Sequence, residues 1–138
     1  MKKILLKNAN LVLENKIEKA TVLVCEDKIE KIFSKDSDLS QITYDELIDL
    51  EGKYLGPAFV DVHVHGADGA DAMDIDEEAL RRISKYLAKE GTANFLVTTL
   101  TSTKDELKNV LEIAGKLQNK EIDGANIFGV HMEGPYFA

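Results

Sequence analysis

The apolar pattern after residue 55 constrains the fold of this 138-residue chain most strongly. Short apolar runs at residues 59–63, 95–100 and 126–130 predict three strands. Two segments with helical periodicity separate these runs. One begins near Asp76, and the other opens with the capping-box sequence Thr103-Lys104-Asp105-Glu106. Strands that alternate with helices in this way predict a parallel sheet, either open or closed into a barrel.

The two predicted helices each carry one apolar face. In the first, acidic residues crowd the opening turn, where the helix dipole favours them, and Gly91 is expected to end the helix. The apolar residues of the first helix are Leu80, Ile83 and Leu87, and those of the second are Leu107, Val110, Leu111, Ala114 and Leu117.

The part before residue 55 has a different pattern, in which short apolar runs alternate with polar turns. It predicts a small antiparallel sheet, and we place a domain boundary between residues 1–54 and 55–138. The predicted strands are 4–6, 11–13, 21–25, 29–33 and 48–50, with hairpin turns at 14–16 and 26–28.

Composition excludes several classes of function. The net charge is −8 and the 17 basic residues form no stripe, so we expect no nucleic-acid partner. No apolar run approaches the roughly 20 residues that cross a bilayer, and we expect no membrane segment. The lone cysteine, Cys25, lies in an apolar run, which predicts a buried thiol and fits a reducing cytoplasm.

A His-x-His pair at His63 and His65 ends the first predicted strand of the second part. Residues i and i+2 of a strand point to the same face, so the two imidazoles can share a metal ion. Gly66 and Gly69 follow and favour a loop that a substrate can approach. The alternative is a pair of histidines on a half-exposed strand that bind nothing.

Glu133 follows the third predicted strand, and it supplies a second candidate metal ligand. Chemistry in parallel α/β folds gathers at the carboxyl ends of the strands, and His63, His65 and Glu133 all fall at such ends. A strand end that carries such a residue is rarely the end of a protein. We therefore expect this chain to be the front part of a larger enzyme.

Four stretches resemble the amidohydrolase superfamily, and most closely its N-acetylglucosamine-6-phosphate deacetylases. Residues 55–66 resemble the family's first barrel strand with its His-x-His, although Ala58 replaces the usual glycine. Residues 91–96 and 98–107 resemble the second strand and its exit into a helix. Residues 129–136 are the most specific, because the deacetylases place a metal-binding glutamate in a His-x-Glu-Gly-Pro setting that matches Glu133.

The resemblance implies an α/β fold: a small β-sandwich portion, then the first β/α units of a (β/α)8 TIM barrel, incomplete in this chain. It implies one or two divalent ions, zinc or iron, bound through His63, His65 and Glu133. Asp61 and His131 would support these ligands without touching the ion. No catalytic residue is expected in this chain, because the general base would be an aspartate beyond Ala138.

The implied activity is hydrolysis of N-acetylglucosamine 6-phosphate to glucosamine 6-phosphate and acetate by a cytoplasmic homo-oligomer. A metal-activated water would attack the acetamide carbonyl, and the general base would then protonate the leaving amine. Two alternatives are a dihydroorotase-like hydrolase of cyclic amides, against which the Glu-Gly-Pro sequence at Glu133 argues, and a non-catalytic fragment. Tyr136 and Phe137 are expected to pack in a loop.

Three strands cannot close a barrel that needs eight. The third strand would then lack an outer neighbour. We therefore expect residues 1–138 on their own to be poorly folded or oligomeric, with an edge strand paired between chains.

Overall fold

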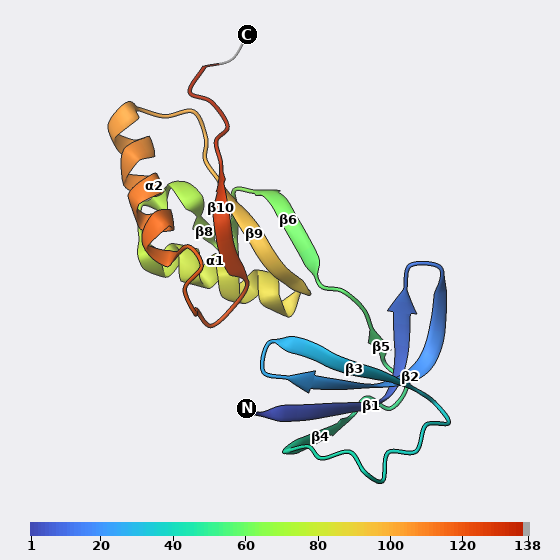
Figure 1. Cartoon of the computed structure of the whole chain (residues 1–138). Coiled ribbons are helices and arrows are strands. Elements are labelled where there is room, and N and C mark those ends of the chain that lie inside the picture. The colour runs from blue at the N-terminus through green and yellow to red at the C-terminus, as the bar shows by residue number, and fades with distance from the viewer. Residues whose placement is uncertain (137–138) are drawn as a thin grey trace. The chain divides into compact units, whose positions relative to one another are not determined.

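The computed structural model of the chain describes residues 1–136, and Figure 1 shows their elements in chain order. Two compact units make up the chain, Met1–Pro57 and Ala58–Ala138. The regular elements of the first unit are strands, whereas the second unit contains both α-helices. Neither helix in the described residues is long and apolar enough to cross a lipid bilayer.

The first unit is one five-stranded sheet in the order β3-β2-β1-β4, with β5 also paired to β1. Two antiparallel hairpins join the first three strands, and their turns lie within the predicted segments 14–16 and 26–28. The strands are β1 (Lys3–Leu13), β2 (Lys16–Cys25), β3 (Lys28–Ser34), β4 (Glu46–Asp49) and β5 (Tyr54–Leu55).

The prediction of a wholly antiparallel sheet is wrong, because β4 and β5 pair with β1 in parallel. The polar segment after β3 is long enough to carry the chain across to the far side of β1. A parallel neighbour requires such a crossover, whereas a tight turn gives only antiparallel pairing.

The prediction of separate strands at residues 4–6 and 11–13 is also wrong, because both segments belong to β1. The register of β1 against β2 shifts between Leu6 and Ala9, and Asn8 adopts a left-handed φ of 59° there. The Asn8 amide donates to the Asp49 carboxylate at 2.9 Å. The polar pair at residues 7 and 8 therefore marks a β-bulge rather than the end of a strand.

The second unit alternates strands and helices, as the sequence predicted. Strands β6 (Phe59–Val64), β9 (Thr92–Thr98) and β10 (Asn126–His131) form a parallel sheet in the order β10-β9-β6. Helix α1 (Glu77–Lys89) connects β6 to β9, and α2 (Lys104–Leu117) connects β9 to β10.

Both helices begin at the residues that the sequence indicated. The Asp76 side chain caps α1, and Thr103 and Glu106 form the capping box of α2. Of the predicted apolar face of α2, Leu111 is partly exposed, whereas the other four residues are buried.

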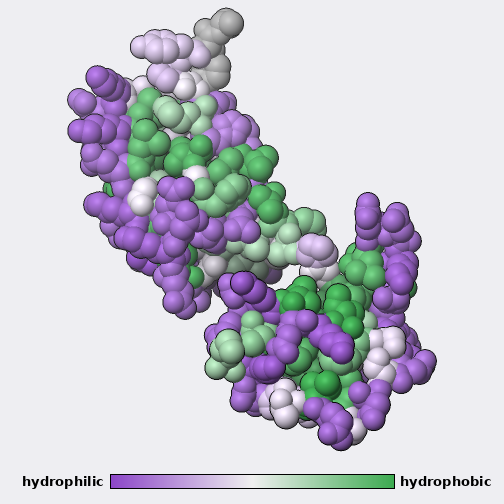
Figure 2. Space-filling view, viewed as in Figure 1, coloured by the Kyte–Doolittle hydropathy of each residue, from purple (hydrophilic) through white to green (hydrophobic). Residues whose placement is uncertain are grey.

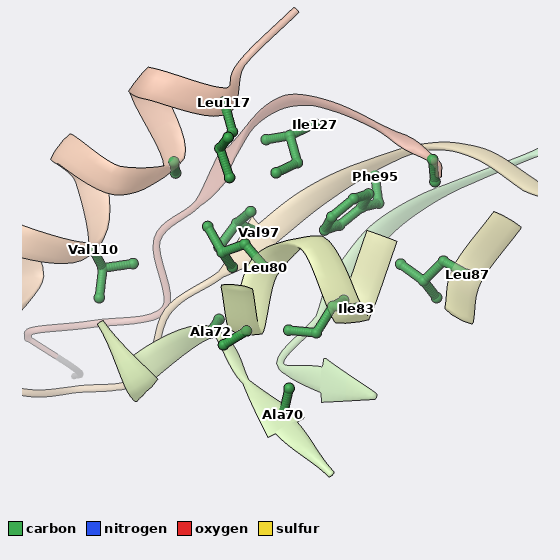
Figure 3. Packing of buried hydrophobic residues seen from close by; sticks show 13 residues of the cluster. Ala70, Ala72, Leu80, Ile83, Leu87, Phe95, Val97, Val110, Leu117 and Ile127 are labelled. Carbon is green, nitrogen blue, oxygen red and sulfur yellow. The ribbon is translucent and has the colours of Figure 1, made fainter. Parts of the chain in front are cut away.

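One apolar core joins the two helices to the same face of the sheet, and Figure 3 shows its side chains packed against one another. Phe95 and Val97 of β9 lie at its centre, each 1% exposed. The large residues around them are Leu80, Ile83 and Leu87 of α1, Val110 and Leu117 of α2, and Ile127 of β10.

A short hairpin that the sequence did not predict follows β6 directly. It consists of β7 (Gly66–Ala67) and β8 (Ala70–Asp71), followed by a 3-10 turn, η1 (Ala72–Asp74). A side chain at Gly66 would collide with the carbonyl of Ala70 across the hairpin, so glycine is required there. The N–H of Ala72 donates to the carbonyl of His65 at 2.7 Å, which fixes the chain just beyond β6.

Candidate metal centre

Three side chains from two strand ends meet in the second unit. The Nε2 atoms of His63 and His65 lie 3.1 Å apart. Oε2 of Glu133 lies 3.0 Å from Nε2 of His63 and 3.2 Å from Nε2 of His65. These are the residues that the sequence predicted as metal ligands, and the fold of residues 1–136 brings their ligand atoms together.

The alternation of the strands explains why these side chains face the same space. Val64 of β6 and Val130 of β10 pack against the apolar core. Neighbouring residues in a strand point to opposite faces, so His63 and His131 lie on the face away from the helices. Glu133 follows His131 by two residues and lies just beyond the end of β10.

The site is half-open to solvent, yet it contains buried atoms without hydrogen bonds. The side chains of His63, His65 and Glu133 are 48%, 33% and 34% exposed. Within the described residues, Oε2 of Glu133 and Nδ1 of His65 are buried and have no hydrogen-bond partner. The short distances from Oε2 to the imidazoles therefore lack the angles of hydrogen bonds. Unpartnered buried polar atoms indicate a place for a further group.

The three ligand atoms fit a divalent metal ion. Imidazole nitrogens and carboxylate oxygens bind zinc at about 2.0–2.2 Å, so atoms held about 3 Å apart can share one ion. The separations of 3.0–3.2 Å between the three atoms meet this condition. Imidazole with carboxylate is a donor set that suits zinc and iron.

Asp61 and His131 both contact the backbone of β6 next to His63. The carboxylate of Asp61 accepts a hydrogen bond from the backbone N–H of His63 at 3.0 Å. Nδ1 of His131 lies 2.8 Å from the carbonyl of Val62, and its ring centroid lies 4.6 Å from that of His63. Their predicted role as supports of the ligands stays a prediction, and these contacts are its physical basis.

Sequence reasoning missed two buried threonines at the end of β9, Thr98 and Thr99, each 0% exposed. The backbone N–H of Val64 donates to Oγ1 of Thr98 at 2.9 Å, and that of Glu133 donates to Oγ1 of Thr99 at 3.2 Å. The available signal was a pair of adjacent hydroxyl residues near the end of an apolar run. Nothing in the sequence showed which backbone groups they would contact.

Tyr136 is 93% exposed, so the expectation that it packs in a loop is wrong for residues 1–136. It follows a Gly-Pro pair that leads the chain away from β10. Phe137, for which the same was expected, lies outside the described residues.

Comparisons with curated proteins give one recurrent name. The chain is 39% identical to N-acetylglucosamine-6-phosphate deacetylase of Vibrio furnissii, over 60% of this chain and 21% of that protein. It is 32% identical to the same enzyme of Lysinibacillus sphaericus, over 76% and 29%. N-acetylgalactosamine-6-phosphate deacetylase of Escherichia coli O157:H7 is 33% identical, over 63% and 23%. The chain thus spans less than a third of these relatives' length. No family model matches it.

Solved structures agree with this result. The deacetylase of Thermotoga maritima superposes with a TM-score of 0.72 at 27% identity, over 97% of this chain and 33% of that one. That of Pasteurella multocida gives 0.83 at 24% identity, over 99% and 35%, which supports the fold alone. L-hydantoinase of Arthrobacter aurescens gives 0.55 at 26% identity, over 83% and 25%.

These likenesses define the class of protein as the amidohydrolases. The sequence identities and the superposed folds both indicate one family within this class. The chain belongs to the N-acetylglucosamine-6-phosphate deacetylase family and spans only part of the length of its members.

Proposed function

We propose that the protein hydrolyses N-acetylglucosamine 6-phosphate to glucosamine 6-phosphate and acetate with a divalent metal ion. The observation that carries this proposal is the convergence of His63, His65 and Glu133 within 3.0–3.2 Å in a chain of this family. The activity belongs to the whole protein, because the chain spans only 21% and 29% of the length of two curated deacetylases.

In this proposal, His63, His65 and Glu133 bind the ion. A divalent ion bound there would polarise a water molecule and lower its pKa toward neutrality. Glu133 would contribute the negative charge of the site, and the two histidines would bind as neutral imidazoles.

The hydrolase domain is proposed to be a (β/α)8 barrel, of which β6, β9 and β10 are the first three strands and α1 and α2 the first two helices. Residues 1–54 would be the small β-sandwich portion and residues 55–138 the start of the barrel domain. A cytoplasmic homo-oligomer completes the proposal, and the single free cysteine, Cys25, fits a reducing compartment.

The alternative is an amidohydrolase that opens a cyclic amide, as the likeness to L-hydantoinase suggests. L-hydantoinase superposes with a lower TM-score, 0.55, than the Thermotoga maritima deacetylase, 0.72, and this difference favours the deacetylase function. Glu133 in its Glu-Gly-Pro setting favours the same choice.

Acetate release by the protein at its natural length tests the proposal. We expect turnover of N-acetylglucosamine 6-phosphate, with much slower turnover of the unphosphorylated sugar. N-acetylgalactosamine 6-phosphate should be assayed alongside, because one relative is named for it. Turnover of dihydroorotate or a hydantoin, with none of either sugar phosphate, would contradict the proposal.

A further inference from the structure

The middle strand of the sheet contacts both segments that carry the ligands of the candidate metal centre. We call the segment with His63 and His65 the first arm and the segment with Glu133 the second arm. Strand β9 lies between β6, which carries the histidines, and β10, which leads to Glu133. Its last residue, Thr98, and the next residue, Thr99, are completely buried. We propose that Thr98 and Thr99 are a pair of positioning residues, each of which holds one arm of the centre through a backbone amide.

The first arm needs such support because the pairing of β6 with β9 is irregular there. The register shifts between Asp61 and Val64, so the segment around His63 forms a β-bulge. A bulge leaves backbone groups without their usual partners in the ladder. The N–H of Val64, between the two histidines, instead donates to Oγ1 of Thr98 at 2.9 Å.

Thr98 is itself fixed by its own strand. Its hydroxyl donates to the carbonyl of Leu96 at 3.3 Å while it accepts from Val64. One buried hydroxyl thus joins β9 to the residue between His63 and His65. Because both bonds use the same oxygen, a side chain of equal shape without a hydroxyl cannot replace it.

The second arm is held in the same way from the adjacent residue. The N–H of Glu133 donates to Oγ1 of Thr99 at 3.2 Å, and the N–H of Thr99 donates to the carbonyl of His131 at 3.0 Å. The chain beyond β10 is thereby tied to the end of β9 at two points. These bonds set where the Glu133 carboxylate meets the histidines.

The two threonines are adjacent in the chain, so we expect them to position the two arms together. Successive residues hold the two arms from one buried segment, so a shift of either hydroxyl changes the separations between the ligand atoms. A metal site depends strongly on groups that orient its ligands, and loss of such a group typically weakens binding 10–100-fold. The proposal rests on the metal site of the proposed function.

Zinc affinity of the protein at its natural length, measured by competition with a chelator, tests the pair. Thr98→Val and Thr99→Val should each weaken zinc binding by about tenfold or more. Thr98→Ser should bind zinc like the wild type, because serine keeps the hydroxyl. Thr98→Ala, which differs from it by one oxygen atom, should bind zinc as weakly as Thr98→Val. Thr92→Val, at the opposite end of β9, is the matched control and should bind zinc like the wild type.

Amide hydrogen exchange provides a second readout that needs no metal. Exchange at Val64 should accelerate in Thr98→Val, and exchange at Glu133 should accelerate in Thr99→Val. Unchanged zinc affinity or unchanged exchange in both variants would overturn the positioning role. A wild-type protein that binds no divalent ion would instead refute the proposed function, and the exchange rates would still decide whether the threonines hold the two arms.

Discussion

Asp61 precedes His63 by two residues, and its carboxylate contacts the backbone rather than an imidazole. Its Oδ1 accepts the N–H of His63 at 3.0 Å, and this bond lies within the bulge of β6. The carbonyl of the same peptide group, that of Val62, lies 2.8 Å from Nδ1 of His131. Side chains therefore contact both polar groups of the peptide that joins Val62 to His63, which helps to keep the His63 imidazole directed at the site.

Because an amide oxygen accepts the same hydrogen bond, the charge of Asp61 should not matter. Asp61→Asn should keep metal binding and most of the activity, whereas Asp61→Leu should weaken metal affinity about 10–100-fold. Metal titrations and acetate release on both variants check this. A fully metallated Asp61→Asn protein without turnover would mean that the carboxylate takes part in the chemistry.

At the scale of elements, periodicity predicted the helices, the parallel strands and the strand ends that carry the ligands. It predicted them because each depends on local patterns such as Leu80, Ile83 and Leu87 on one face of α1. It failed where pairing between distant segments decides the structure. The bulge at Asn8, the parallel pairing of β4 and the bonds of Thr98 depend on neighbours that no local pattern specifies.

Gly124 marks a close approach between α1 and the entry to β10. A Cβ there would lie 2.6 Å from the carbonyl carbon of Ser84 and 2.7 Å from the nitrogen of Lys85. We expect Gly124→Ala to lower the free energy of unfolding by about 1–3 kcal/mol in urea denaturation.

The control for Gly124 is Gly115, inside α2, where a Cβ meets no atom within 4 Å. Gly115→Ala should raise the free energy of unfolding by about 0.5–1 kcal/mol, because alanine loses less entropy in a helix. If both variants shifted stability in the same direction and by the same amount, the close approach at Gly124 would be disproved.

The start of α2 should make stability depend on pH. Hydrogen bonds from the Ser102 hydroxyl, and then from Thr103, hold the pKa of Glu106 below its ordinary value. The stabilisation is therefore complete above the unfolded-state pKa and is lost as pH falls through the folded-state pKa. The stability difference between wild type and Glu106→Gln should be largest near neutral pH and vanish in acid. A difference that stays constant from about pH 7 to pH 3 would contradict the assignment.

At the scale of the molecule, apolar surface is exposed in both units. β6 and β10 are the edges of the parallel sheet in residues 1–136. Phe59, Val60 and Val62 of β6 are 70%, 55% and 56% exposed. In the first unit, an apolar groove of about 280 Å³ runs over the sheet, lined by residues such as Val24 and Ile32. Figure 2 shows apolar residues among polar ones on the surface of each unit.

Unpaired edges and exposed apolar side chains favour association with other chains. Residues 1–138 produced alone should therefore be oligomeric or poorly folded. Size-exclusion chromatography with light scattering, together with thermal melting, checks this expectation. A sharply melting monomer at micromolar concentration would show that the two units bury enough surface by themselves.

Metal analysis of the natural-length protein tests whether Glu133, with His63 and His65, binds a divalent metal ion. Glu133→Gln replaces a charged ligand with a neutral amide of the same shape, and Glu121→Gln, on an exposed loop, is the matched control. We expect bound zinc or iron in the wild type and in Glu121→Gln, and strong loss of the metal in Glu133→Gln with its fold intact. Unchanged metal content in Glu133→Gln would contradict this expectation.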